Sequence, residues 1–345
     1  MVTPAGAAPP DRLVVQQSFP EPRPTTNPYL VMLRDSLAAV PGVQVRTFGW
    51  RAALLGRYDL FHVHWPEILV SGRSRPRALV RQLLTLALLL RLRVTRTPLV
   101  RTLHNLGRPA GLSWTGNTIL AVLERQTTLV ILLNSSTVAP DGVATATIVH
   151  GHYRDWFQGH HKPDPRPGRL CYFGLIKPYK GVDQLLSAFA GLSGDYSLRV
   201  AGKSTSELLH PLTDQAARDA RVELTPAYVD DAELVRVVGE AELVVLPYRE
   251  MHNSGGALAA LSLDRPVLVP SNVVNERLSE EVGPGWVLTY RGPLSAEALG
   301  RAVAAVRSGT RSRRPDLSRR EWDLAGEQHV AAYRLALSRV RRRRA

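Results

Sequence analysis

The chain has 345 residues, enough for two domains of ordinary size, and its apolar content of 44% is that of a globular protein. Its single cysteine, Cys171, excludes a framework of internal disulfides and a cysteine-based metal site. Lysine and arginine number 44 against 30 aspartates and glutamates, and this net charge of +14 favours an anionic partner: a nucleic acid, an acidic membrane surface or a phosphorylated substrate.

The first residues, MVTPAGAAPPDR, contain no basic segment followed by an apolar core. We therefore predict a disordered leader over residues 1–12, no secretory signal, and a cytoplasmic protein. The most apolar run, residues 83–90, is flanked by arginines and is much shorter than the roughly 20 residues that cross a bilayer. We do not expect it to span a membrane.

Strands alternate with helices through residues 13–150. Proline and asparagine mark the start of the first helix, with Asn27 as the expected N-cap and Pro28 as the first helical residue. Such alternation predicts a parallel, doubly wound sheet. The expected strands are 13–17, 43–48, 58–64, 99–103, 129–134 and 145–149, and the expected helices are 29–40, 77–93 and 114–127.

The polar, aromatic and proline-rich residues 151–169 interrupt this alternation and indicate an interdomain linker. The alternation then resumes, which predicts a second doubly wound sheet over 170–310, followed by a helix at 322–340 and a basic tail within 311–345. The expected strands here are 170–175, 197–201, 221–224, 243–246, 267–269 and 286–290, and the expected helices are 182–190, 207–218, 231–240, 275–281 and 295–306.

Two loops at the carboxyl ends of strands in the second half have the composition of phosphate-binding sites. Ser254, Gly255 and Gly256 open a helix, where bare backbone N–H groups and the positive end of the helix dipole attract an anion. The loop 174–181, GLIKPYKG, holds two lysines beside glycine at the start of another helix. The alternatives are an ordinary turn capped by Ser254 and a solvated loop with exposed lysines.

Histidines gather at two places in the first half. His62 and His64 alternate with apolar residues along one strand, so they share a face, and a hydrogen-bonded structural role competes with catalysis. No carboxylate or cysteine partner is fixed by spacing, so we predict no catalytic metal. At the junction of the halves, His150, His152, Tyr153 and Arg154 are candidates to close over a ligand, or simply to pack the linker.

Several separated motifs resemble, in the same order, a known family of enzymes. The motifs are TNPYL, RYDLFHVHWPE, RTLHNL, HGHYRDWF, FGLIKPYKGV, ELVVLPYREMHNSG, ALSLDRPVL and EVGPGWV. In these motifs the chain is similar to the xanthan-type GDP-mannose:glycolipid 4-β-mannosyltransferases, glycosyltransferase family 94, which have the GT-B fold of two Rossmann-like domains facing across a cleft.

The resemblance implies transfer of mannose from GDP-mannose to an oligosaccharide on polyprenyl diphosphate, with inversion at the anomeric carbon and no cofactor. Retaining GT-B enzymes carry two glutamates eight positions apart, but alignment on RPV places Met251 and Ala259 there. The resemblance and the loop positions together indicate a donor-binding set: Gly174, Lys177, Lys180, Gly181, Glu250, Asn253, Ser254, Gly255 and Gly256.

Inverting transfer needs a general base, expected from the first domain. Glu67 is the first candidate, because Trp65 and Pro66 beside it would exclude water and raise its pKa, and His104 is the second. We also place near the acceptor or hinge a further set of residues: Asn27, His64, Trp65, Asn105, His152, Tyr153 and Arg154.

The basic, apolar segment 77–96 and the arginine tail suit peripheral docking on anionic lipid near a lipid-linked acceptor, against the alternative of a solvated basic surface. No aromatic RNA-binding platform or recognition-helix motif is found, so nucleic acid ranks below the membrane. Two other functions stay open. One is a hexosyltransferase with another donor or a retaining outcome, and the other is a catalytically silent protein that binds a sugar nucleotide or lipid.

Overall fold

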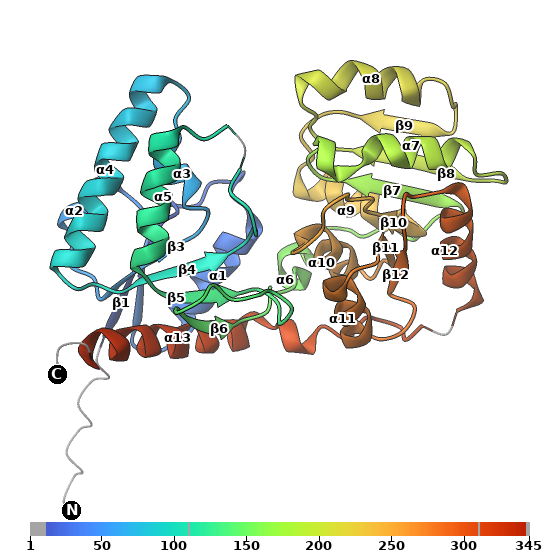
Figure 1. The fold of residues 1–345 in the computed structure, drawn as a ribbon. Coiled ribbons are helices and arrows are strands. Elements are labelled where there is room, and N and C mark those ends of the chain that lie inside the picture. The colour runs from blue at the N-terminus through green and yellow to red at the C-terminus, as the bar shows by residue number, and fades with distance from the viewer. Residues whose placement is uncertain (1–11, 110, 310, 343–345) are drawn as a thin grey trace, which may run out of the picture. The chain divides into compact units, whose positions relative to one another are not determined.

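A computed structural model describes residues 12–109, 111–309 and 311–342 of the chain (Figure 1). The predicted leader therefore lies almost wholly outside the described residues. The described chain divides into two compact units, one that ends at Gly151 and resumes at Arg320, and one formed by His152–Arg319. Each unit contains a six-stranded parallel sheet with helices around it, which confirms the predicted α/β class.

The first unit is built on a sheet of strand order β2-β1-β3-β4-β5-β6. The chain leaves β1 to one side to form β2 and returns to the other side to form β3, so the two connections diverge at the carboxyl ends of β1 and β3. Ligands of open α/β sheets bind at such a point. The strands are β1 (Leu13–Gln17), β2 (Val43–Arg46), β3 (Leu60–Val63), β4 (Leu99–Leu103), β5 (Thr127–Leu132) and β6 (Ala144–Thr147).

Helices cover both faces of this sheet. Phe61 and Val63 of β3 share one buried apolar core with side chains of α2, α3, α4 and α5. The last helix of the chain, α13, packs along α1 and against β4 and β5. The helices are α1 (Pro28–Ala39), α2 (Trp50–Leu55), α3 (Glu67–Val70), α4 (Arg75–Val94), α5 (Trp114–Gln126) and α13 (Trp322–Arg342).

The second unit has the strand order β12-β11-β10-β7-β8-β9, and its connections diverge between β7 and β10. Helix α7 packs against α8 and α12, while α9 lies against β7 and α10 against β11. The strands are β7 (Arg169–Phe173), β8 (Ser197–Ala201), β9 (Val222–Thr225), β10 (Leu243–Val245), β11 (Val267–Pro270) and β12 (Val287–Tyr290). The helices are α6 (Arg154–Phe157), α7 (Val182–Ala190), α8 (Ser206–Ala216), α9 (Asp231–Gly239), α10 (Gly255–Ser262), α11 (Val273–Val282) and α12 (Ala296–Ser308).

The structure differs from the predicted linker at 151–169. The backbone N–H of Tyr153 donates to Ser262 Oγ at 2.8 Å, and Arg154 pairs with Asp264 at 3.4 Å. These contacts fold α6 onto α10, so residues 152–169 belong to the second unit. The C-terminal segment is likewise divided, because residues 311–319 belong to the second unit and α13 to the first.

Three short helices, α2, α3 and α6, were not predicted, because four to six residues are too few to show a helical period. Asn27 is the N-cap of α1 as predicted, and its side chain accepts a hydrogen bond from the Tyr29 N–H at 3.0 Å. Among the described helices none is both long and apolar enough to span a bilayer, and the apolar run 83–90 lies inside α4.

Candidate active site

The loop after β7 is shaped by glycine backbone. Gly174 has a φ of +107°, and a Cβ added there would meet nothing within 4 Å. Beneath it lies Gly202, where an added Cβ would come within 1.8 Å of the Gly174 carbonyl oxygen. The two backbones pack without side chains, which leaves open space above Gly174 at the carboxyl end of β7, where a ligand can approach.

The lysine loop, residues 174–181, packs closely against the loop after β10. Gly181 has a φ of +68°, and a Cβ added to it would lie 2.1 Å from the carbonyl oxygen of Pro247. Only glycine therefore allows the two backbones to pack this closely. Arg249 ties the same loops together. Its N–H donates to the Tyr179 carbonyl at 2.8 Å, and its guanidinium pairs with Asp183 at 2.5 Å. The two loops therefore hold one fixed geometry.

Lys180 projects from this loop onto an aromatic ring. Its ammonium lies 3.5 Å from the centroid of the Tyr248 ring and 5.2 Å from that of Tyr179, as cation–π contacts require. Burial, followed by repulsion from Lys177, lowers the pKa of Lys180 to about 7. The charged form of Lys180 is thus destabilised in the free protein, and an anionic ligand beside the ammonium would stabilise that charged form.

Helix α10 begins beside the same tyrosine. Ser254 is its N-cap, accepting a hydrogen bond from the Ala257 N–H at 3.2 Å, and Gly255 and Gly256 form the first turn. The Tyr248 hydroxyl lies 3.2 Å from the position of a Cβ on Gly256, so Tyr248 lies between the Lys180 ammonium and the helix N-terminus. A cation and a positive helix end lie together at the carboxyl ends of β7 and β10, an arrangement that can bind a diphosphate.

The remaining residues of the predicted donor set lie around this seat. Lys177 and Glu250 are exposed, and Asn253 is half-buried. Met251 is held by Asn272, whose side-chain amide donates to the Met251 carbonyl at 2.9 Å, and Ala259 is buried within α10. The structure therefore brings the lysine loop and the glycine-led helix together, with no carboxylate at positions 251 and 259.

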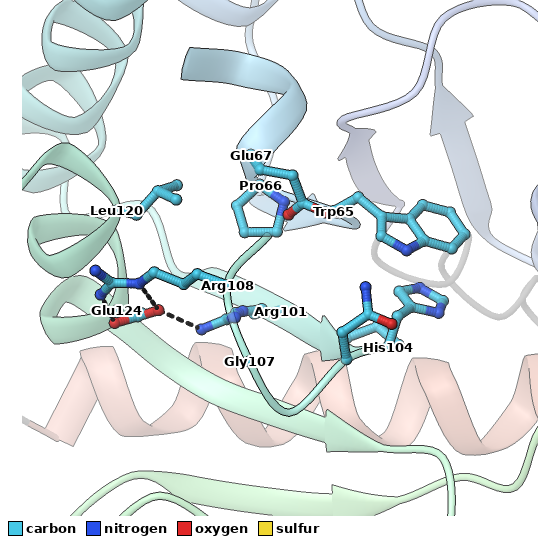
Figure 2. Close-up of a pocket in the computed structure, with 11 residues that line it drawn as sticks. Trp65, Pro66, Glu67, Arg101, His104, Gly107, Arg108, Leu120 and Glu124 are labelled. Atoms are coloured by element: carbon cyan, nitrogen blue, oxygen red, sulfur yellow. Dashed lines mark hydrogen bonds and ion pairs between the residues drawn. The ribbon is translucent and has the colours of Figure 1, made fainter. Parts of the chain in front are cut away.

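In the first unit, Trp65 and His104 lie at the carboxyl ends of β3 and β4. Trp65 has a φ of +45°, a costly conformation for a bulky residue, and its ring stacks on His104 with centroids 3.9 Å apart and planes 16° apart. Glu67 begins α3 directly afterwards. Together with Asn105, these residues line a hollow of about 20 Å³, room for one water molecule (Figure 2).

Arginines form the opposite wall of this hollow. Glu124 pairs with Arg101 at 3.2 Å and with Arg108 at 2.5 Å, so one carboxylate is shared between two guanidiniums (Figure 2). Among the residues drawn in Figure 2, the marked ion pairs join Arg101 and Arg108 to Glu124, and none joins the carboxylate of Glu67. The hollow thus combines the carboxylate of Glu67 and the His104 ring with an ion-pair network of two arginines and one glutamate.

A cluster of buried histidines lies behind His104. His62 Nδ1 is 2.8 Å from the Tyr333 hydroxyl of α13, and its Nε2 is 2.8 Å from the Thr102 hydroxyl. Burial, with a smaller contribution from neighbouring histidines, holds the pKa of His62, His64 and His104 well below the ordinary value. The cluster is therefore neutral at pH 7, and both ring nitrogens of His62 are engaged, one by Tyr333 and one by Thr102.

The predicted hinge residues are distributed over both units. His150 packs against Tyr29 in the first unit, with ring centroids 4.7 Å apart, whereas His152, Tyr153 and Arg154 fold onto the second. The contacts of Tyr153 and Arg154 match the packing alternative for this segment. In the described part of the chain, no group of three histidines, cysteines, aspartates or glutamates is arranged to hold a metal ion.

Sequence patterns did not single out three residues that shape these sites: Gln17, Gly202 and Tyr248. Gln17 ends β1 between Gln16 and Ser18, and nothing in the sequence shows that its side chain meets a histidine 47 residues later. Gly202 and Tyr248 act on loops that are distant in the sequence. Their roles come from strand order, which brings β8 and β10 to either side of β7.

Comparisons with known proteins agree with the class that this architecture defines. A model of glycosyl transferases group 1 matches residues 167–307. The fold is similar to HepE from Anabaena in complex with UDP and glucose, with a TM-score of 0.59 and 15% identity over 96% of this chain and 98% of that one. It is similar also to sucrose-phosphate synthase from Thermosynechococcus elongatus, with a TM-score of 0.58 and 14% identity over 94% and 95% of the two chains. The protein is a glycosyltransferase of the GT-B fold.

A curated relative identifies the family more narrowly. The chain is 44% identical, over 98% of its length and 96% of the relative's, to the GDP-mannose:glycolipid 4-β-D-mannosyltransferase of Xanthomonas campestris pv. campestris. The chain belongs to the family of these mannosyltransferases, which confirms the resemblance of its motifs.

Proposed function

We propose that the protein transfers mannose from GDP-mannose to a glycolipid, and that the acceptor is an oligosaccharide on polyprenyl diphosphate used in exopolysaccharide synthesis. Near full-length similarity to a relative named for this donor and this acceptor class is the observation that carries the proposal. The diphosphate seat of the second unit supports it from the structure alone, because a nucleotide sugar presents a diphosphate.

Each part of the seat has a task in this proposal. The Lys180 ammonium and the N–H groups of Gly255 and Gly256 stabilise negative charge on the diphosphate as the bond to the sugar breaks. Open space above Gly174 admits the donor close to the backbone. Lys177, exposed on the same loop, adds a second cation, so the protein supplies the charge stabilisation that a divalent metal supplies elsewhere.

We propose an inverting outcome, in which the acceptor hydroxyl attacks C1 of mannose opposite the departing GDP. The absence of a carboxylate at Met251 and Ala259 supports it, since these positions hold the acidic pair of retaining relatives. A base must take the hydroxyl proton. Glu67 and His104, which line one small hollow in the first unit, are the candidates.

We also propose that the first unit docks on an acidic lipid surface on the cytoplasmic face of the membrane. Residues 68–123 contain no aspartate or glutamate, and their nine arginines are Arg73, Arg75, Arg77, Arg81, Arg91, Arg93, Arg96, Arg101 and Arg108. Along α4, Leu79, Leu83, Leu86 and Leu90 recur at helical spacing and are 42–63% exposed. Exposed leucines between arginines match the apolar and charged layers of an anionic bilayer.

The aromatic side chain at the start of α5 extends this apolar surface. Trp114 is 80% exposed, and the preceding Ser113 accepts a hydrogen bond from Gln82 of α4 at 3.1 Å. Leu79 and Leu86 flank Gln82 by three and four residues, so they lie on the same side of α4 as Trp114. Tryptophan favours the membrane–water interface, which suits docking by this face.

Donor choice is tested by thermal denaturation with GDP-mannose, GDP, UDP and ADP. A ligand that binds only the folded protein raises the melting temperature, so the guanine compounds should stabilise the protein more than UDP or ADP. Transfer is then followed with GDP-mannose and a polyprenyl-diphosphate oligosaccharide. Stabilisation and transfer only with uridine donors would reject GDP-mannose, and tight binding without transfer to any acceptor would favour a silent binding protein.

A further inference from the structure

Three side chains form a hydrogen-bonded row at the carboxyl ends of three adjacent strands. His64 Nε2 lies 3.3 Å from Gln17 Oε1, and His64 Nδ1 lies 3.1 Å from His104 Nε2. Gln17 is the last residue of β1, whereas His64 and His104 directly follow β3 and β4, and the three strands are neighbours in the sheet. Gln17 and His64 are buried, at 0% and 3% exposure, whereas His104 reaches the hollow that holds Glu67.

The row fixes where each neutral ring carries its proton. The carbonyl oxygen of Gln17 can only accept, so His64 Nε2 carries the hydrogen and donates it. The lone pair of His64 is then on Nδ1, so His104 Nε2 carries the hydrogen of the second bond. In neutral His104 the remaining lone pair is therefore on Nδ1.

Two further contacts fix the orientation of the His104 ring. Trp65 stacks on one face, and Tyr29 meets the ring at its edge, with centroids 5.2 Å apart and planes 89° apart. The backbone of Trp65 keeps a positive φ to hold its ring in place, and such strain at a ligand-facing strand end is typical of functional sites. Ring position and tautomer of His104 are thus both determined.

We propose that Gln17 and His64 are positioning residues that hold His104 as the Nε2–H tautomer, so that His104 Nδ1 takes the proton of the acceptor hydroxyl during transfer. This inference rests on the proposed inverting transfer. As the hydroxyl oxygen bonds to C1 of mannose, the C1–phosphate oxygen bond breaks and its electron pair leaves with GDP. The hydroxyl proton moves to Nδ1, and His104, now an imidazolium, keeps its Nε2–H bond to His64 before it loses the proton to solvent.

Charge considerations agree with this role. Burial holds the pKa of His104 well below its ordinary value, so the ring is neutral at pH 7 and carries a lone pair on one nitrogen. In this assignment Glu67, which lines the same hollow, is not the base.

Two substitutions at His64 separate positioning from packing. In His64→Asn the side-chain oxygen occupies the place of Nδ1 and can accept from His104 Nε2, whereas His64→Leu has a similar bulk without an acceptor. General bases contribute about 10²–10⁴-fold, so His64→Leu should lower kcat by about 10²-fold or more, while the KM for GDP-mannose is unchanged. His64→Asn should recover most of that loss.

Nitrogen-15 NMR of histidine-labelled protein gives a readout that packing alone would not move. The wild type and His64→Asn should show hydrogen on Nε2 of His104, and Gln17→Leu should give a mixture of tautomers. Hydrogen on Nδ1 of His104 in the wild type, or full kcat in a folded His64→Leu, would overturn the inference. The spectrum is recorded whether or not the protein transfers mannose, and donor-induced thermal stabilisation reports on the proposed function separately.

Discussion

The Lys180 ammonium makes binding of the donor a proton-linked event. Its pKa is about 7 in the free protein because of burial and the neighbouring Lys177. A diphosphate beside the ammonium favours the charged form, so Lys180 gains a proton when the donor binds at a pH above 7. GDP-mannose is the suitable ligand, because its diphosphate has no group of its own that titrates near neutral pH.

The size of the effect follows from the titration of Lys180. With a pKa of about 7, roughly 0.9 of the molecules lack the proton at pH 8 and roughly 0.1 lack it at pH 6. Binding should therefore take up about 0.9 proton at pH 8 and about 0.1 at pH 6, and affinity should fall about tenfold for each pH unit above 7.

Calorimetric titration in two buffers of different ionisation enthalpy measures the protons directly. Lys180→Met should abolish the uptake at pH 8, whereas Lys177→Met, which removes only the smaller cause of the lowered pKa, should reduce the uptake without abolishing it. Burial lowers the pKa of His252, which lies two residues before Ser254, below its ordinary value, so this histidine is neutral at pH 8 and does not contribute. No uptake at pH 8, or uptake that survives Lys180→Met, would refute the assignment of Lys180.

Three further predictions address stability, the loop geometry and the membrane. Burial lowers the pKa of His329 from 6.5 to about 4, so the unfolded chain binds more protons between these values and stability falls as pH drops from about 6.5 to 4, by roughly 3 kcal/mol from this residue. Melting temperatures should depend on pH less steeply in His329→Leu, and an unchanged slope would reject this account. Gly181→Ala forces a Cβ against the Pro247 carbonyl, so we expect a loss of roughly 2 kcal/mol in stability and at least tenfold weaker donor binding. If the variant keeps both the stability and the donor affinity of the wild type, the close packing of the two loops is contradicted. In cosedimentation with vesicles of phosphatidylglycerol and phosphatidylcholine, Leu83→Asp should weaken binding by about tenfold, and the similarly exposed Leu335→Asp should not; equal effects would argue against α4 as the docking face.

Periodicity and turn residues predicted most of the architecture. The strand at Leu99–Leu103 and the helix at Val182–Ala190 have the predicted bounds, since apolar runs and flanking glycines mark them. Alternation along β3 also predicted that His62 and His64 share a face, and their rings lie 4.1 Å apart. These features depend on local sequence alone.

The parts of the candidate site that depend on distant residues were not predictable in this way. Tyr248 lies under the Lys180 ammonium because β10 is beside β7, and Tyr333 reaches His62 because α13 returns to the first unit. Neither contact can be inferred from the spacing of residues in the sequence. The polar, proline-rich composition of the segment around Tyr153 and Arg154 predicted a linker. Its hydrogen bonds go to Ser262 and Pro315, which are more than 100 residues away in the sequence, so local composition could not reveal them.

The central claim is tested most directly by the product formed from carbon-13 GDP-mannose and a polyprenyl-diphosphate oligosaccharide. We predict release of GDP and a single new mannosyl linkage, whose anomeric carbon–hydrogen coupling in the NMR spectrum is that of the β configuration. An α linkage would contradict the inverting mechanism, and transfer from a uridine donor with none from GDP-mannose would contradict the proposed reaction.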